Sequence, residues 1–158
     1  TMEFVWFGAE EKGLLGSRDY IRVHESELGA HRFNMNVDLA GQLIGGNVLG
    51  VTGEASVCDK LLEIADGGGI GASAKNQIWG SDSNSFAWKG IPAMTLNRDG
   101  FGMHTRYDTI DLLSAWSLER SAILLGCIAD ELGNAEVFPF ERKMPEKFLG
   151  ELDEYMCR

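Results

Sequence analysis

The chain has 158 residues, of which 44% are hydrophobic and 24% are charged, proportions that are ordinary for one globular domain with a core of its own. Its formal net charge of −10 argues against nucleic acid or an anionic membrane surface as the main partner, because both attract clusters of Lys and Arg. No apolar run approaches the roughly 20 residues that a helix needs to span a bilayer.

The first third of the chain predicts alternating strands and helices. A nearly continuous apolar run over 2–9 predicts a central strand, and apolar residues near a 3.6-residue period predict a helix over 13–24. Alternating apolar and polar residues over 31–39 predict a second strand, and a further strand is expected over 47–53.

The alternation continues in the remainder of the chain. A helix is expected over 56–69, where glycines end it, and a short helix capped by Ser and Asp is expected over 81–90. The segment 91–97 predicts a strand with proline near its beginning. The longest helix is expected over 110–132, and 138–158 is expected to wrap the surface or form a short helix. Strands that alternate with helices indicate a layered α/β domain.

The three cysteines are widely separated and form no CxxC pair. An odd count is poor evidence for a disulfide framework. Cys58 and Cys127 lie among apolar residues at helical spacing, which predicts buried, inert thiols, and Cys157 lies near the end of the chain.

Two adjacent carboxylates, Glu10 and Glu11, follow the first predicted strand. Successive side chains at the end of a strand point to opposite sides. One carboxylate is then free to bind a metal, while the other accepts a proton from a water that the metal activates. By themselves, two glutamates before a turn fit a solvated helix start better than a metal site.

Two further residues follow predicted strands. Asp38 ends the second strand, and ligands of open α/β sheets gather beyond the carboxyl ends of strands. A turn or helix cap explains this aspartate equally well. His104 follows a third strand and a glycine-rich loop, although a lone histidine is more often a surface residue than a ligand. The other histidines, His24 and His31, lie in a polar connection and are expected to be exposed.

The order of these motifs carries more information than any one of them. The chain contains EE with GLxGS, then VDLAG, SDSxxF, GIP and HTxxDTxD. In this order the pattern resembles the di-zinc aminopeptidase family that includes bacterial leucyl aminopeptidases, aminopeptidase Y and the glutaminyl cyclases, over about residues 4–125. The closing HTxxDT favours this family over other zinc exopeptidases that also have EE before a glycine. The resemblance implies a three-layer α/β/α fold with a mixed, largely parallel sheet. It makes residues 1–158 a single α/β domain that corresponds to the C-terminal portion of a larger zinc peptidase catalytic domain.

The resemblance also implies a role for each of these residues. Glu10 matches the general base, Glu11 and His104 match ligands of one zinc ion, and Asp38 matches a ligand of a second. The implied reaction is hydrolysis of the peptide bond next to a free N-terminus. A metal-bound hydroxide attacks the carbonyl, and Glu10 passes the proton to the leaving amine. The implied substrate is a peptide with a free N-terminus.

Several family residues have no counterpart in this chain. The family's remaining ligands, the His of an HxD motif and an Asp that bridges the metals, lie upstream of the glutamate pair, and only nine residues precede Glu10. The ligand set is therefore incomplete, and weak zinc binding is expected. Ser83 stands where the family often has His, and Met103 where it often has Tyr, a hydrogen-bond donor that a thioether does not replace.

Three interpretations of function remain at the level of sequence. The first is a zinc-dependent aminopeptidase, with the activity of this chain alone in question. The second is a non-catalytic domain of the same fold that acts through a partner chain, and the third is a glutaminyl cyclase-like acyltransferase. A partial sheet would expose an edge that a second copy of the chain or the missing N-terminal half would cover.

Overall fold

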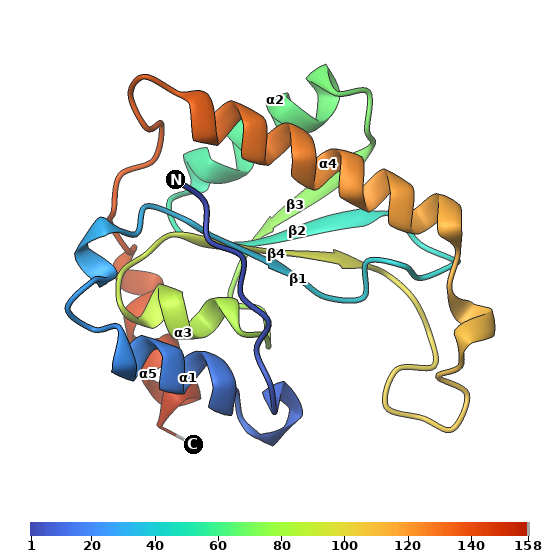
Figure 1. Cartoon of the computed structure of the whole chain (residues 1–158), viewed down its shortest axis with the longest axis horizontal. Helices are drawn as coiled ribbons and strands as arrows, with labels where there is room; N and C mark the ends of the chain where they lie inside the picture. The colour runs from blue at the N-terminus through green and yellow to red at the C-terminus, as the bar shows by residue number, and fades with distance from the viewer. Residues whose placement is uncertain (158) are drawn as a thin grey trace.

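A mixed sheet of four strands runs through the centre of the computed structural model, which describes residues 1–157 (Figure 1). The strands lie in the order β1–β4–β2–β3. β1 pairs parallel with β4, β2 pairs parallel with β3, and β2 and β4 are antiparallel. The strands are β1 (Asn34–Val37), β2 (Asn47–Thr52), β3 (Ala72–Asn76) and β4 (Ala93–Arg98).

Helices cover both faces of the sheet and make the three layers that the resemblance implies (Figure 1). Two helices, α2 (Ala55–Gly67) and α4 (Ala115–Asn134), lie on one face, and three helices lie on the other. The three are α1 (Leu15–Val23), α3 (Ser83–Trp88) and α5 (Glu146–Met156). Among the helices of residues 1–157, none is long and apolar enough to cross a membrane.

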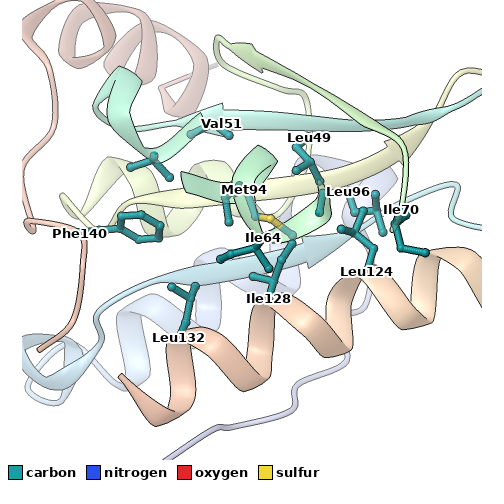
Figure 2. Packing of buried hydrophobic residues seen from close by; sticks show 13 residues of the cluster. Leu49, Val51, Ile64, Ile70, Met94, Leu96, Leu124, Ile128, Leu132 and Phe140 are labelled. Carbon is teal, nitrogen blue, oxygen red and sulfur yellow. The ribbon is translucent and has the colours of Figure 1, made fainter. Parts of the chain in front are cut away.

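The main core fills the space between the sheet and the pair α2 and α4. Figure 2 shows Leu124, Ile128 and Leu132 reaching from α4 toward the strands. Both central strands are buried along their whole length, because each pairs with a strand on both sides and helices cover both faces of the sheet. Each fully buried side chain of this size contributes about 1.5–3 kcal/mol of transfer free energy. The buried strand and α2 residues in this core are Leu49, Val51, Met94, Leu96, Val57, Leu61, Ile64 and Ala65.

Two smaller clusters hold the helices of the opposite face. Phe148 and Leu152 of α5 pack with Ala87 of α3 and Ala93 of β4, which is why this C-terminal segment is helical rather than only wrapped over the surface. Ile21 of α1 packs with Phe86 and Ile91 in the third cluster. The apolar stripe of each helix thus determines which of its sides faces the sheet.

Most of the predicted elements are confirmed with adjusted bounds. The predicted helices over 13–24, 56–69 and 81–90 correspond to α1, α2 and α3, and the predicted strands over 31–39 and 91–97 correspond to β1 and β4. The strand expected over 47–53 is β2, and 138–158 contains α5. The longest helix starts at Ala115 rather than 110, because Ile110–Leu112 forms a separate 3-10 turn and the Ser114 hydroxyl accepts a hydrogen bond from the Ser117 N–H at the true N-cap.

The strand expected over 2–9 is absent, and this prediction is wrong. Residues 1–7 lie outside the sheet in extended chain, with Phe4 78% and Trp6 89% exposed. An apolar run forms a strand only where a neighbouring strand pairs with it, and within the described residues β1 pairs with β4 alone.

The sequence analysis missed β3. Its sequence, ASAKN, has no β-branched or aromatic residue, so its propensity is low. The strand forms because β2 offers a parallel partner from Asn47 opposite Ala72 to Val51 opposite Asn76.

The expectation that His24 and His31 are exposed is also wrong. Both are half-buried against Tyr20 of α1. The His24 ring stacks on Tyr20 with 4.4 Å between centroids, and His31 Nε2 lies 3.4 Å from the Tyr20 hydroxyl. Tyr20 covers part of both histidines, and the polar residues next to them in the sequence gave no indication of this contact.

The cysteines are all unpaired. Cys58 and Cys127 are partly rather than fully buried, and burial raises the pKa of the Cys58 thiol. A raised pKa leaves less thiolate at neutral pH, in keeping with the predicted inert character of Cys58. Cys157 is exposed.

Candidate active site

The topology brings the predicted site segments to one end of the sheet. Because β1 and β4 are parallel, their carboxyl ends lie at the same end of the sheet. Asp38 directly follows β1, and His104 lies in the loop that follows β4. Glu10 and Glu11 form a 3-10 turn immediately before α1.

Glu11 and His104 are in direct contact although 93 positions separate them in the chain. His104 Nε2 lies 2.7 Å from Glu11 Oε1, which is hydrogen-bonding distance. Their side chains are 68% and 63% exposed. The contact therefore has open access to solvent and to a ligand.

Backbone strain accompanies these segments. Among residues 1–157, the non-glycine residues with positive φ are Ala9, Leu14, Leu39 and His104, with φ between 48° and 61°. Ala9 precedes the glutamate pair, Leu39 follows Asp38, and His104 is itself a predicted ligand. A side chain in this left-handed region costs about 1–2 kcal/mol per residue, and such strain clusters at functional sites where the surrounding fold maintains it.

The carboxylates at this edge influence one another. Burial raises the pKa of Glu10, the charges of Glu11, Asp38 and Asp82 raise it further, and His104 opposes the shift. Burial also raises the pKa of Asp38, with Asp82 and Glu11 adding to the shift, whereas a 3.0 Å hydrogen bond from Asn36 Nδ2 to Asp38 Oδ2 lowers it. The four predicted residues thus belong to one electrostatic cluster, within which only Glu11 and His104 touch.

Asp82 is a member of this cluster that the sequence analysis did not single out. The residue is 7% exposed, and Oδ1 is buried with no hydrogen-bond partner among the described residues. Burial raises its pKa, and a hydrogen bond with Ser17 lowers it. Asp82 stands at the N-cap of α3, but its side chain makes no capping bond, so the expected capping role is wrong. Its place in the SDSxxF motif was the available signal.

Ser83, the residue at the family's histidine position, is buried in a cluster of hydroxyl groups. Its hydroxyl lies 2.8 Å from both the Ser81 and Thr95 hydroxyls, and all three residues are buried. The third pair of this triad, Ser81 and Thr95, is 2.6 Å apart. Ser83 therefore stabilises the packing of α3 on β4. Met103, beside His104, is 47% exposed.

Two hollows of about 310 and 290 Å³ lie beside α1, and neither is lined by the four predicted residues. Glu11 and His104 lie exposed at the end of the sheet.

The contacting pair has the donor chemistry of a zinc site. Carboxylate oxygen and imidazole nitrogen are both zinc ligands, and two ligand atoms of a tetrahedral zinc lie roughly 3.3 Å apart. The 2.7 Å contact is shorter, so a small outward movement of either exposed side chain reaches that spacing. Within residues 1–157, no group of three or more His, Cys, Asp or Glu side chains is arranged to hold a metal. These residues fit zinc in donor type and supply only part of a coordination shell.

Comparisons with known proteins point in one direction. The model of peptidase family M28 matches residues 1–126. Similar solved structures include the zinc aminopeptidase BSAP from Bacillus subtilis, with a TM-score of 0.67 and 23% identity over 88% of this chain. LapA aminopeptidase from Legionella pneumophila has a TM-score of 0.70 and 22% identity over 84% of the chain. An aminopeptidase from Aneurinibacillus sp. strain AM-1 has a TM-score of 0.66 and 26% identity over 79% of the chain.

The chain matches only part of each of these proteins. It covers 38% of the Bacillus enzyme, 39% of the Legionella enzyme and 32% of the Aneurinibacillus enzyme. The comparison with curated protein sequences found no match.

Proposed function

Because this chain belongs to peptidase family M28 and has the fold of zinc aminopeptidases, we propose that its protein is a zinc-dependent aminopeptidase. The proposed reaction is hydrolysis of the peptide bond next to a free N-terminus. The observation that carries the proposal is the 2.7 Å contact between Glu11 and His104. Two exposed side chains from distant segments meet there with the donor types that zinc prefers, and His104 is in the strained left-handed region.

Glu11 and His104 would hold one ion, and Asp38 would contribute to a second. When bound, zinc acts as a Lewis acid that polarises a carbonyl and makes water more acidic. The chain itself supplies the environment of that chemistry, an edge of clustered carboxylates that attracts both the metal and the free ammonium group of a peptide.

Glu10 is the proposed general base. It takes the proton from the attacking water and then gives it to the leaving amine. A base works best when its pKa approaches the working pH, and burial with three neighbouring carboxylates raises the pKa of Glu10 in that direction. Within the described residues the Glu10 carboxylate forms no hydrogen bond or ion pair, so its oxygens remain available to water.

The proposal is tested with the full-length protein. Metal analysis is combined with an aminoacyl-arylamide assay, before and after treatment with a chelator and after zinc is restored. We expect hydrolysis that the chelator abolishes and zinc restores. Blocking the N-terminus of the substrate with an acetyl group should prevent cleavage. A protein that binds no zinc and cleaves no substrate overturns the proposal.

A second candidate function is a non-catalytic domain of the same fold that acts through a partner chain. Burial of Ser83 in a hydroxyl triad, where the family often has histidine, supports this alternative. The same assay separates the two, because a non-catalytic domain retains the fold and its partner but releases no amino acid from any arylamide.

A further inference from the structure

Arg98, the last residue of β4, is a buried cation that forms no ion pair with any described carboxylate. It is 3% exposed. Burying a charge without partners is costly, so its contacts must compensate for lost water. Three of the five N–H groups of its guanidinium donate hydrogen bonds to neutral oxygens.

All three oxygens belong to the chain segment between β1 and the start of β2. Nε donates to the Gln42 carbonyl at 3.1 Å, Nη1 donates to Asn47 Oδ1 at 2.9 Å, and Nη2 donates to the Gly45 carbonyl at 2.5 Å. This segment, residues 38–46, begins with Asp38 and is called the Asp38 loop. One side chain of β4 thus holds the Asp38 loop at two points and the start of β2 at a third.

The loop that carries His104 starts directly after Arg98. This segment, residues 99–114, is called the His104 loop. It is tied to the Asp38 loop at its far end, where Leu43 N donates to Leu112 O at 2.7 Å and Ser114 N donates to Gly41 O at 2.9 Å. The two loops therefore form one unit, anchored at its base by the guanidinium.

The base of this unit is tightly packed. Gly45 has φ +102°, and a Cβ at that position would lie 1.6 Å from the Asp99 carbonyl oxygen. Only glycine permits such an approach of the two loops. The loops also contain two of the strained residues, Leu39 and His104, whose conformation persists only where the surroundings maintain it.

We infer that Arg98 is a positioning residue for the metal site, which sets the relative position of Asp38 and His104 by holding the two loops together. The inference rests on the proposed function. A planar guanidinium presents five N–H donors in a fixed fork and stays charged, whereas a lysine ammonium is a point charge on a flexible stem. Three bonds in different directions therefore require arginine.

The test uses the full-length protein with Arg98→Met and Arg98→Lys. Zinc affinity is measured by calorimetry, and the visible spectrum of the Co²⁺-loaded protein reports coordination geometry. Removal of a residue that orients metal ligands typically costs about 10–100-fold in metal affinity. We expect a loss in that range and an altered Co²⁺ spectrum for Arg98→Met, with Arg98→Lys intermediate. Amide exchange of the metal-free protein should quicken in both loops.

Asn76→Ala is the matched control. Asn76 Nδ2 likewise donates to two backbone carbonyls, Val51 O at 3.2 Å and Gly53 O at 2.9 Å, at the opposite end of the sheet. We expect this variant to lose stability but to keep zinc affinity, Co²⁺ spectrum and exchange in the two loops.

If Arg98→Met does not fold, Asn47→Ser decides, because it removes one acceptor of the guanidinium. A few-fold loss of zinc affinity supports the inference. A folded Arg98→Met protein with wild-type zinc affinity and Co²⁺ spectrum overturns this inference but not the proposed function. If Arg98→Met does not fold, the same result for Asn47→Ser overturns it. A wild-type protein without zinc binding or hydrolysis overturns the proposed function and this inference together.

Discussion

The two ends of the sheet are built differently. At the end where β1 and β4 terminate, strained non-glycine residues, a buried arginine and mutually repelling carboxylates meet. At the opposite end, polar groups are paired in ordinary ways, as when Thr52 Oγ1 donates to Gln77 O at 3.3 Å and Asn76 bonds two carbonyls. The left-handed turn there is a glycine, Gly90, with φ 75°.

This difference shows where the fold maintains energetically unfavourable features. Paired polar groups and glycine turns minimise free energy, whereas strain and like charges raise it. Their concentration at one end is typical of a functional site, whereas the other end has the paired groups of an ordinary stable structure. Substitutions at each end test this distinction.

Glu10→Gln should have the largest effect. The amide keeps the size of the side chain but does not accept a proton, so we expect kcat to fall by about 10²–10⁴-fold with zinc affinity unchanged. The arylamide assay and calorimetry check this. Glu63→Gln, at an exposed glutamate of α2, is the control and should retain full activity. Undiminished turnover in Glu10→Gln would remove Glu10 from the mechanism.

Leu49→Ala tests the core that both ends share. Leu49 is fully buried in β2 opposite Leu96 of β4. Truncation should lower the free energy of unfolding by about 2–5 kcal/mol, measured by urea denaturation. Where the variant is folded, its zinc affinity should match wild type. A large change in affinity without loss of stability would contradict the separation between core and site.

His104→Ala and His104→Gly separate a ligand role from strain. Both remove the imidazole, so zinc affinity should fall at least about tenfold in each. At φ 61° alanine is strained and glycine is not, so His104→Gly should be more stable than His104→Ala by about 1 kcal/mol. Thermal denaturation of the metal-free variants measures the difference. Equal stabilities would show that the left-handed backbone relaxes once the imidazole is lost.

Asp82→Asn should have the smallest effect and a pH dependence of defined sign. Burial raises the pKa of Asp82 above its ordinary value of 3.8, so the folded state binds the proton more tightly than the unfolded state does. The buried Asp82 carboxylate therefore destabilises the folded state. This effect is absent below pH 3.8, where the group is protonated in both states, and it grows as pH rises through the folded-state pKa.

Asp82→Asn removes this penalty. Relative to wild type, we expect the variant to gain Tm at pH 7 and to lose that gain on acidification toward pH 3.8. Scanning calorimetry across this range measures it, with Asp66→Asn on α2 as a control that should show no such trend. A gain that persists at low pH would point to packing rather than to charge.

Much of the fold was predictable from local patterns. The apolar periodicity of α1, α2 and α4 and the apolar residues of β2 and β4 reflect burial that any α/β arrangement of this chain would need. The same patterns failed at residues 2–7, which are apolar but unpaired, and at β3, which is paired but has low propensity. Pairing depends on a neighbour distant in sequence, so local patterns do not reveal it.

The candidate site was predictable in part. Glu10, Glu11, Asp38 and His104 were identified from ordered motifs, and their catalytic and metal-binding roles remain predictions. The burial of Asp82 and the three bonds of Arg98 were not predicted, because they depend on groups distant in the chain, which for Arg98 are 51–56 residues away.

The amino-acid sequence by itself determined that the chain forms a layered α/β domain with most of its helices, and which side chains carry carboxylate and imidazole groups. Both properties are local, since they depend on residue type and short-range periodicity. Only the tertiary structure decided that β1 and β4 end on the same side of the sheet and that Glu11 contacts His104. It also decided that the Arg98 guanidinium holds the Asp38 loop beside the His104 loop. Those outcomes follow from long-range pairing and burial, which exist only once the chain has folded.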